Sequence, residues 1–438
     1  MVLIVQKYGG SSVSDVEAIK RVAKRIVETR NAGHKLVVVV SAMGDTTDEL
    51  LDTAAQITDN APEREMDILL TAGERISMSL LSMAINELGV PAQAFTGAQA
   101  GIHTTSAYGR AQITGMVPER VARSISEGQV AIVAGFQGIS DDDDVTTLGR
   151  GGSDTTAVAL AAALHADVCE IYTDVDGLFS ADPRIVSKAH RLRSISTEET
   201  LELAAHGAKI LHLRAVEFAR RYKVPLHVRS SFSEKEGTWI SDRPASPALK
   251  GLVPDAAFLD PKEGKMEQPI ISGIAHDRGQ DKITVAGVLN HPGRAAMVFQ
   301  TIAAAGANID MIVQNIPVAD PTRANITFTI PEADAQVALD ALESAKDEIG
   351  FKEVRYNPNI GKLSLVGTGM RTNPGVAARL FAALSEAGIN IDLISSSEIR
   401  LSIVTKLDDL DRAVAVVHSA FGLDAEVSEA VVYAGTGR

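Results

Sequence analysis

The apolar run from Leu36 to Val40 places the strongest constraint on the fold of this 438-residue chain. A strand that is apolar on both faces must be covered on both, as the central strand of a parallel sheet is. Other short apolar runs occur at residues 2–5, 92–95, 130–136 and 168–173. Amphipathic stretches typical of helices alternate with them, including residues 72–88, 155–165, 197–205 and 210–222. This alternation predicts an α/β domain over residues 1 to about 232, with strands joined by helices.

The first helix has its own start and stop signals. Residues 14–17, with Ser14 and Glu17 at the ends, have the sequence of a capping box that would open the helix. Apolar residues then recur at helical spacing until Gly33, where the helix should end.

A repeat occurs in the last third of the chain. Each copy has a strand, a loop with Pro-Gly, an amphipathic helix and the sequence Asn-Ile-Asp, and the interval from Pro292 to Asn308 equals that from Pro374 to Asn390. Two copies are too few for a solenoid, so a paired β-α-β module is expected. The segment from Ser233 to about residue 269 is rich in Gly, Pro, Ser and charged residues and predicts a domain boundary. The predicted domains are 1–245, a linker at 246–268, then 269–347 and 348–438.

Composition narrows the class of partner. The formal net charge is −14, which disfavours a nucleic acid, because phosphate backbones require clustered Lys and Arg. A single cysteine, Cys169, cannot form an internal disulfide and fits a reducing compartment, so a cytoplasmic protein is expected. No apolar run approaches the ~18 residues of a membrane span, and no membrane is expected as partner.

The first candidate motif lies between the opening strand and the first helix. It contains Lys7, Gly9, Gly10, Ser11 and Ser12. Glycine allows backbone N–H groups to approach a ligand closely, and lysine supplies a positive charge, so this turn could hold phosphate. The alternative is a turn that needs glycine only for its geometry. The spacing is neither that of a Walker A loop nor of a dinucleotide fingerprint.

The most informative motif opens the helix predicted at residues 155–165. Arg150 precedes a Gly-Gly pair, and Ser153 and Asp154 follow it. The helix N-terminus favours an anion, and an arginine can bind a carboxylate through two parallel hydrogen bonds. A purely structural helix start rarely needs so many special residues.

Two further loops are less specific. Ser41 and Thr47 follow the buried strand and could bind an anion or simply cap a helix. Asp174, Asp176 and Asp182 follow the run at 168–173 and could serve a nucleotide and magnesium, or form a solvated turn. Lys209 would add a second cation, and positioned positive charge is what phosphoryl transfer requires of a protein.

No metal site is expected from side chains. Asp141 to Asp144 are adjacent and cannot all face one ion, so an exposed loop is the better interpretation. The ten histidines show no metal-binding spacing, and Cys169 lies in an apolar run where a core role is more common.

Taken together, the motifs resemble those of the aspartokinase family. The stretches that carry the resemblance are KYGGSSV, TAGERIS, TTLGRGGSDTTA, YTDVDGLFSADPR and the doubled segment with Pro-Gly and Asn-Ile-Asp. The resemblance covers nearly the whole chain. Within the family, the chain is most similar to the bacterial form that lysine and threonine inhibit jointly. The resemblance implies a three-layer α/β/α amino-acid-kinase fold followed by two ferredoxin-like (βαββαβ) ACT domains. It also implies an enzyme that transfers the γ-phosphate of ATP to the β-carboxylate of L-aspartate, with Mg²⁺ held mainly by phosphate oxygens and water.

The resemblance assigns roles by position. The implied catalytic residues are Lys7, Asp154 and Lys209. The implied aspartate-binding residues are Ser41, Thr47, Glu74, Arg150, Ser153 and Asp154. The implied ATP-binding residues are Lys7, Tyr8, Gly9, Gly10, Ser11, Thr173, Asp174, Phe179, Asp182, Arg184 and Lys209.

The same resemblance implies that the two repeats bind regulatory amino acids. The implied lysine- or threonine-binding residues are Asn290, His291, Pro292, Gly293, Arg294, Ala295, Gln314, Asn373, Gly375, Asn390 and Ile391. The ACT domains should pair between subunits, in a homo-oligomer or with a separate regulatory chain. Two rivals stay open: another carboxylate or carbamate kinase of the same fold, and a catalytically silent amino-acid sensor.

Overall fold

A computed structural model describes residues 1–208, 210–242, 270–368, 370, 373, 375–425, 431 and 433. These residues form two units. The first unit contains 1–205, 210–242 and the C-terminal residues 424, 425, 431 and 433, and the second contains 206–208 and the rest of 270–423. The predicted linker at 246–268 and Lys209 lie outside the described residues.

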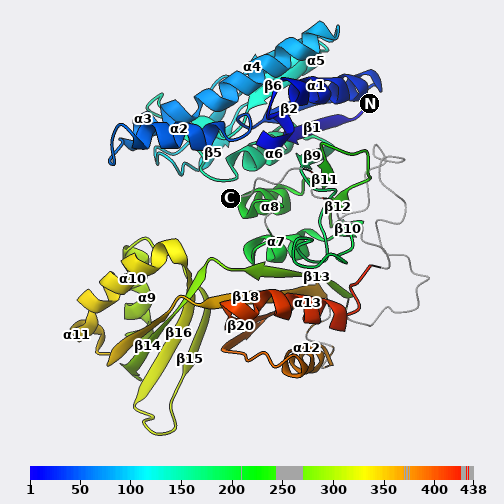
Figure 1. Cartoon of the computed structure of the whole chain (residues 1–438). Coiled ribbons are helices and arrows are strands. Elements are labelled where there is room, and N and C mark those ends of the chain that lie inside the picture. Colours follow the sequence, from blue (N-terminus) through cyan, green and yellow to red (C-terminus); the bar gives the residue numbers. More distant parts are fainter. Residues whose placement is uncertain are drawn as a thin grey trace. The chain divides into compact units, whose positions relative to one another are not determined.

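The first unit is built on an eight-stranded sheet (Figure 1). Its order is β10 (Ser194–Ile195), β12 (Thr238–Ile240), β11 (Leu226–Ser230), β9 (Val168–Thr173), β1 (Leu3–Tyr8), β2 (Lys35–Val40), β6 (Val130–Ala134) and β3 (Ala92–Phe95). All neighbours are parallel except β11 and β12. The strand predicted to be central, β2, is fully buried from Leu36 to Val40.

Helices cover the sheet in layers. On one face, α1 (Val16–Asn31) packs beside α4 (Ala72–Glu87), and their apolar residues share one core cluster with the sheet. The helix α6 (Gly152–Ala163) packs against β1, β2 and β9. The helix α8 (Leu213–Tyr222) packs on α6 and on α7 (Thr197–Ala205). The other helices are α2 (Thr46–Ala55), α3 (Glu63–Leu70) and α5 (Glu119–Ser126). The predicted three-layer α/β/α fold is confirmed.

A small second sheet in this unit was not predicted. Its order is β5 (Ile113–Met116), β4 (Ile102–Thr104), β7 (Gln137–Ser140) and β8 (Val145–Thr147). The strands are only three or four residues long, too short to give a clear alternation in the sequence. Asp141 to Asp143 are exposed between β7 and β8, as expected of a loop.

Three boundaries differ from the prediction for local reasons. The N-cap of α1 is Asp15, not Ser14, because the Asp15 carboxylate accepts the N–H of Ala18 (2.8 Å). Lys7 lies within β1 rather than in the turn, since the pairing of β1 with β2 and β9 runs on to Tyr8. The helix α6 starts at Gly152 because Gly151 is left-handed (φ 72°) and can end the preceding loop.

Two four-stranded antiparallel sheets form the second unit. One has the order β15 (Asp310–Asn315), β16 (Arg323–Pro331), β14 (Gln280–Leu289) and β17 (Glu353–Asn357). The other has the order β13 (Ile270–Asp277), β18 (Ile360–Thr368), β20 (Arg400–Lys406) and β19 (Leu393–Ser396). The helices are α9 (Arg294–Ala304), α10 (Glu332–Ser344), α11 (Lys346–Ile349), α12 (Gly375–Glu386) and α13 (Leu410–Ala420).

The two repeats exchange strands across the predicted boundary between 269–347 and 348–438. The strand β13 precedes the first repeat but pairs with β18 of the second, and β17 follows residue 347 but pairs with β14 of the first. A boundary in sequence is therefore not a boundary between sheets. The described residues 424, 425, 431 and 433, which the prediction placed in 348–438, group with the first unit.

One segment, Glu63–Glu87, has a length and apolar content that would pass for a membrane span by composition alone. It comprises α3 and α4, and α4 buries Ser77, Met78, Leu81 and Ile85 as a helix that packs on a sheet. These buried residues belong to the core, whereas Ile76, Leu80 and Met83 on the same helix are exposed.

Candidate active site

The candidate site lies where four parallel strands end. The last residues of β1, β2, β6 and β9 are Tyr8, Val40, Ala134 and Thr173, and the register of the sheet puts them at one edge. The chain leaves β1 toward β2 on one side, while β9 lies on the other side, so strand order reverses at this point. Open α/β sheets bind ligands at such an edge.

An ion pair joins the first and third motifs. The Lys7 ammonium lies 2.7 Å from the Asp154 carboxylate, and only 13% and 12% of the two side chains are exposed. A Cβ on the nearby Gly9 would lie 3.4 Å from the Lys7 nitrogen, so the glycine turn passes close to this ion pair. The Lys7 ammonium is thus held in place near the end of β1, beside the glycine turn.

The first and second motifs are in backbone contact. The N–H of Gly44 donates to the carbonyl of Gly10 (3.2 Å), and a Cβ on Gly10 would lie 3.0 Å from the carbonyl oxygens of Ala42 and Gly44. The N–H of Ser41 donates to the carbonyl of Tyr8 (3.1 Å). Glycine at position 10 therefore allows the two loops to meet. Ser11 lies in the short 3₁₀ turn that follows, and Thr47 lies in the first turn of α2.

Glu74, in the first turn of α4, carries an unused buried oxygen. One carboxylate oxygen accepts the N–H of Ala42 (3.1 Å), and the other has no hydrogen-bond partner among the described residues. Burial raises the pKa of Glu74 to about 7, against the opposing effect of the backbone hydrogen bonds. Ser77, one turn later, donates to the carbonyl of Ser41 (2.7 Å) and ties α4 to the same loop. A cation from a ligand would satisfy this carboxylate.

The third motif is shaped by glycine. Gly151 is packed so closely that a Cβ would lie 2.0 Å from the ring of His212. Ser153 is buried and packs against Gly135, at the end of β6. Arg150 between the glycines is exposed and has no hydrogen bond or ion pair with any residue the structure describes. Its guanidinium is therefore available to a ligand.

The fourth motif follows β9. The Thr173 hydroxyl donates to the Asp174 carboxylate (2.9 Å), and Arg184 pairs with Asp182 (2.9 Å). Phe179 is buried and pairs with Arg191 through an isolated bridge. The loop starts beside the end of β1, because β9 pairs with β1 as far as Tyr8 and Tyr172. Lys209 lies outside the described residues.

The predicted effector residues fall in loops of the second unit. Gly293 is left-handed (φ 93°) and caps α9, and Arg294 donates to the carbonyl of Glu348 (2.6 Å). Asn290, His291 and Pro292 are exposed just before them.

The remaining predicted effector residues lie on other elements. Ala295 is in α9, Gln314 is exposed on β15, and Gly375 starts α12 after Asn373. The carbonyl of Asn390 accepts the Thr405 hydroxyl (2.8 Å), and Ile391 follows. The described contacts do not join the residues from the two repeats into one pocket.

Sequence reasoning missed several residues that support the site. Asp67 on α3 is buried and accepts hydrogen bonds from the N–H of Gly109, the N–H of Thr147 and the Thr147 hydroxyl (2.6 Å). His212 packs on Gly151, and burial lowers its pKa. An acidic residue at an inward position of an amphipathic helix was the only signal for Asp67.

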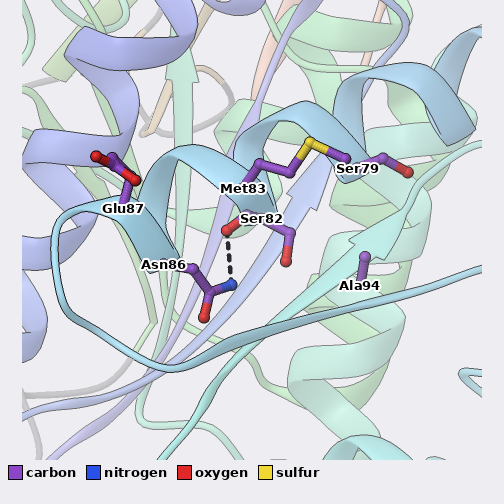
Figure 2. A pocket seen from close by; sticks show the side chains of 6 residues that line it. All are labelled: Ser79, Ser82, Met83, Asn86, Glu87 and Ala94. Atoms are coloured by element: carbon purple, nitrogen blue, oxygen red, sulfur yellow. Dashed lines mark hydrogen bonds between the residues drawn. The ribbon is translucent and has the colours of Figure 1, made fainter.

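A separate surface hollow lies over the second half of α4 and the edge strand β3. Figure 2 shows its lining, which is Ser79, Ser82, Met83, Asn86, Glu87 and Ala94. The Asn86 amide donates to the carbonyl of Ser82 (2.8 Å). None of the predicted site residues lines this hollow, and it has no cationic side chain for a phosphate.

Comparison with known families matches both units. The amino acid kinase family matches residues 2–230, and the ACT domain matches residues 283–345 and 363–421. Full-length relatives include the aspartokinases of Mycolicibacterium smegmatis, 57% identical, and Corynebacterium glutamicum, 52% identical, each over 100% of both chains.

Solved structures agree with this match. E. coli aspartokinase III in complex with aspartate and ADP, described as the R-state, is 25% identical and covers 96% of this chain and 100% of its own, with a TM-score of 0.79. The same enzyme in complex with lysine and aspartate, described as the T-state, is 25% identical and covers 95% and 99%, with a TM-score of 0.67.

Proposed function

The chain belongs to the aspartokinase family, and from this premise we propose that it phosphorylates the β-carboxylate of L-aspartate with ATP at the edge formed by β1, β2, β6 and β9. The family makes it a phosphotransferase with a carboxylate acceptor and regulatory ACT domains. The proposal includes the roles of individual residues, the amino acids that inhibit the enzyme and the biosynthetic pathway in which it acts.

Glu74 carries the proposal. Its buried, unpartnered oxygen would receive the ammonium group of aspartate. Arg150 is exposed and has no protein partner among the described residues, so its guanidinium would bind the α-carboxylate through two parallel hydrogen bonds. Ser41, Thr47 and Ser153 would complete the pocket. These charges match an α-amino acid and distinguish aspartate from the substrate of a simple carboxylate or carbamate kinase.

Lys7 would act at the reacting atoms. A β-carboxylate oxygen of aspartate attacks the γ-phosphorus, the bond to the bridging oxygen breaks, and ADP leaves with that electron pair. No proton has to be removed from the carboxylate, so no general base is needed. Lys7 would neutralise charge on the migrating group, and Asp154 would keep the ammonium aimed by its 2.7 Å contact.

The nucleotide would lie across the first and fourth motifs. Backbone N–H groups after Tyr8, at Gly9, Gly10 and Ser11, would bind phosphates. The residues proposed for the rest of the nucleotide are Thr173, Asp174, Phe179, Asp182, Arg184 and Lys209. Mg²⁺ would be held mainly by phosphate oxygens and water, as this ion prefers, and would neutralise phosphate charge.

We further propose that lysine and threonine together inhibit the enzyme through the loops around Asn290 and Asn390, at the entry to lysine, threonine and methionine synthesis. ACT sheets with exposed edge strands favour pairing between subunits, in a homo-oligomer or with a regulatory chain. Light scattering after size exclusion tests the pairing. The cytoplasm, which supplies ATP and aspartate, is the proposed compartment.

Trapping of the acyl phosphate with hydroxylamine tests the reaction. Purified protein, ATP and magnesium are incubated with L-aspartate or L-glutamate, with and without lysine plus threonine. A hydroxamate with aspartate alone, lost when both effectors are present, is expected. Absence of product with either acid would support the silent sensor, and a product insensitive to the effectors would refute the proposed inhibition.

A further inference from the structure

Three described residues near the C-terminus, Asp424, Ala425 and Tyr433, contact the loop that follows β9. Asp424 forms an isolated bridge with Ala189, and the N–H of Ala425 donates to the carbonyl of Lys188 (2.8 Å). Further on, the N–H of Tyr433 donates to the carbonyl of Asp174 (3.0 Å). The tail therefore contacts the loop near both of its ends.

The side chain of Tyr433 makes two further contacts. Its ring stacks on that of Phe232, with centroids 5.9 Å apart and planes inclined by 14°. Its hydroxyl lies 3.4 Å from the carboxylate of Asp176. Phe232 is itself held by Arg21, whose guanidinium carbon lies 4.9 Å from the ring centroid.

Asp176 is a fixed point in this loop. Its side chain is only 1% exposed, and it accepts hydrogen bonds from Ser233 (2.6 Å) and Lys235 (2.8 Å) as well as the longer contact from Tyr433. Because Asp174 is two residues earlier, the tail and the Asp176 cluster together fix the backbone at the start of the loop.

We propose that Tyr433 is a positioning residue of the nucleotide site, and that the C-terminal tail is required for full nucleotide affinity. This inference rests on the proposed function, which assigns Asp174 to the nucleotide. Tyr433 acts through the backbone of Asp174 and the ring of Phe232, and it reduces the cost of ordering the loop when the nucleotide binds. The ring stack and the backbone hydrogen bond carry the effect, whereas the 3.4 Å hydroxyl contact adds little.

Binding of MgADP to the full chain, measured by calorimetry, tests the inference. Tyr433→Ala should raise the Kd for MgADP and the KM for ATP between about threefold and tenfold, the range expected for a lost aromatic pair. The KM for aspartate should not change, and the melting temperature should fall only slightly, since Tyr433 is 36% exposed. Tyr433→Phe should restore nearly wild-type affinity, and a chain ending at Leu423 should match Tyr433→Ala or bind more weakly.

Tyr356→Ala is the matched control. Tyr356 is also a partly exposed tyrosine that donates to an aspartate, Asp281 (2.7 Å), but it lies in the second unit. It should leave MgADP affinity unchanged. Unchanged affinity in both Tyr433→Ala and the shortened chain would overturn the inference, and so would tighter binding, which would mark the tail as an inhibitor. A wild-type chain that binds no MgADP would instead refute the proposed function.

Discussion

At the scale of single residues, Glu74 shows a conflict between stability and binding. A buried carboxylate with one unpartnered oxygen is costly to ionise, and burial accordingly raises its pKa to about 7. Its position at the start of a long helix is visible in the sequence, but its burial against the loop after β2 is not. The sequence could therefore identify Glu74 only through resemblance.

Glu74→Gln should stabilise the empty protein in a pH-dependent way. The folded pKa is raised above 4.5, so wild-type Glu74 is protonated in the folded state at pH 5 and ionised at a cost at pH 8. The difference in the free energy of unfolding between variant and wild type should increase by roughly 2 kcal/mol, in favour of the variant, from pH 5 to pH 8. Denaturant titrations at the two pH values measure the gain, and a constant difference would contradict the assignment.

The same pKa predicts how aspartate binding depends on pH. Only ionised Glu74 can bind the ammonium group, so the wild-type KM for aspartate should fall as pH rises through about 7. In Glu74→Gln this KM should be higher at pH 8 and nearly flat with pH, while the KM for ATP stays the same in both proteins. An equal pH profile in wild type and variant would remove Glu74 from the aspartate site.

At the scale of elements, the conformation of the loops depends on glycines and on pairing between strands that are distant in sequence. Apolar runs predicted β2, β3 and β9 at their observed positions, and helical spacing predicted α7. The extension of β1 through Lys7 depends on pairing with two neighbouring strands, which no local pattern reveals. The small sheet escaped prediction for the same reason.

Gly151→Ala tests the shape of the loop that carries Arg150. Both Gly151 and Gly388 are left-handed, at φ 72° and 67°, but a Cβ on Gly151 would overlap His212 whereas one on Gly388 meets nothing within 4 Å. Gly388→Ala should cost only the backbone strain of about 1 kcal/mol. Gly151→Ala should destabilise by more than twice that and abolish most turnover. Equal costs in chemical denaturation would show that the contact with His212 is unimportant.

At the scale of the whole molecule, the two repeats are joined by reciprocal ion pairs. Asp310 of the first Asn-Ile-Asp sequence pairs with Lys362 of the second repeat (2.7 Å), and Asp392 of the second pairs with Lys282 of the first (2.6 Å). The equal spacing in the sequence predicted the copies. It could not predict these pairs, the exchange of β13 and β17, or the return of the C-terminal residues to the first unit, which all join distant segments.

Removal of the two aspartates should have unequal effects. The Lys362 side chain is 1% exposed, so Asp310→Asn leaves a buried ammonium without a charged partner and should cost about 2 kcal/mol. Lys282 is 19% exposed, and Asp392→Asn should cost less than about 1 kcal/mol. Hydrogen exchange of the β18 amides measures both, and a larger effect for Asp392→Asn would contradict this ranking.

Binding of the aspartate ammonium group by Glu74 is tested most directly by comparing L-aspartate with succinate in the hydroxylamine assay. Succinate has both carboxylates but lacks the ammonium group that Glu74 is proposed to bind. We expect acyl phosphate to form from aspartate at least 100-fold faster than from succinate at pH 8, roughly what losing a buried charged contact implies. Equal rates with the two acids, or no product from aspartate, would contradict it.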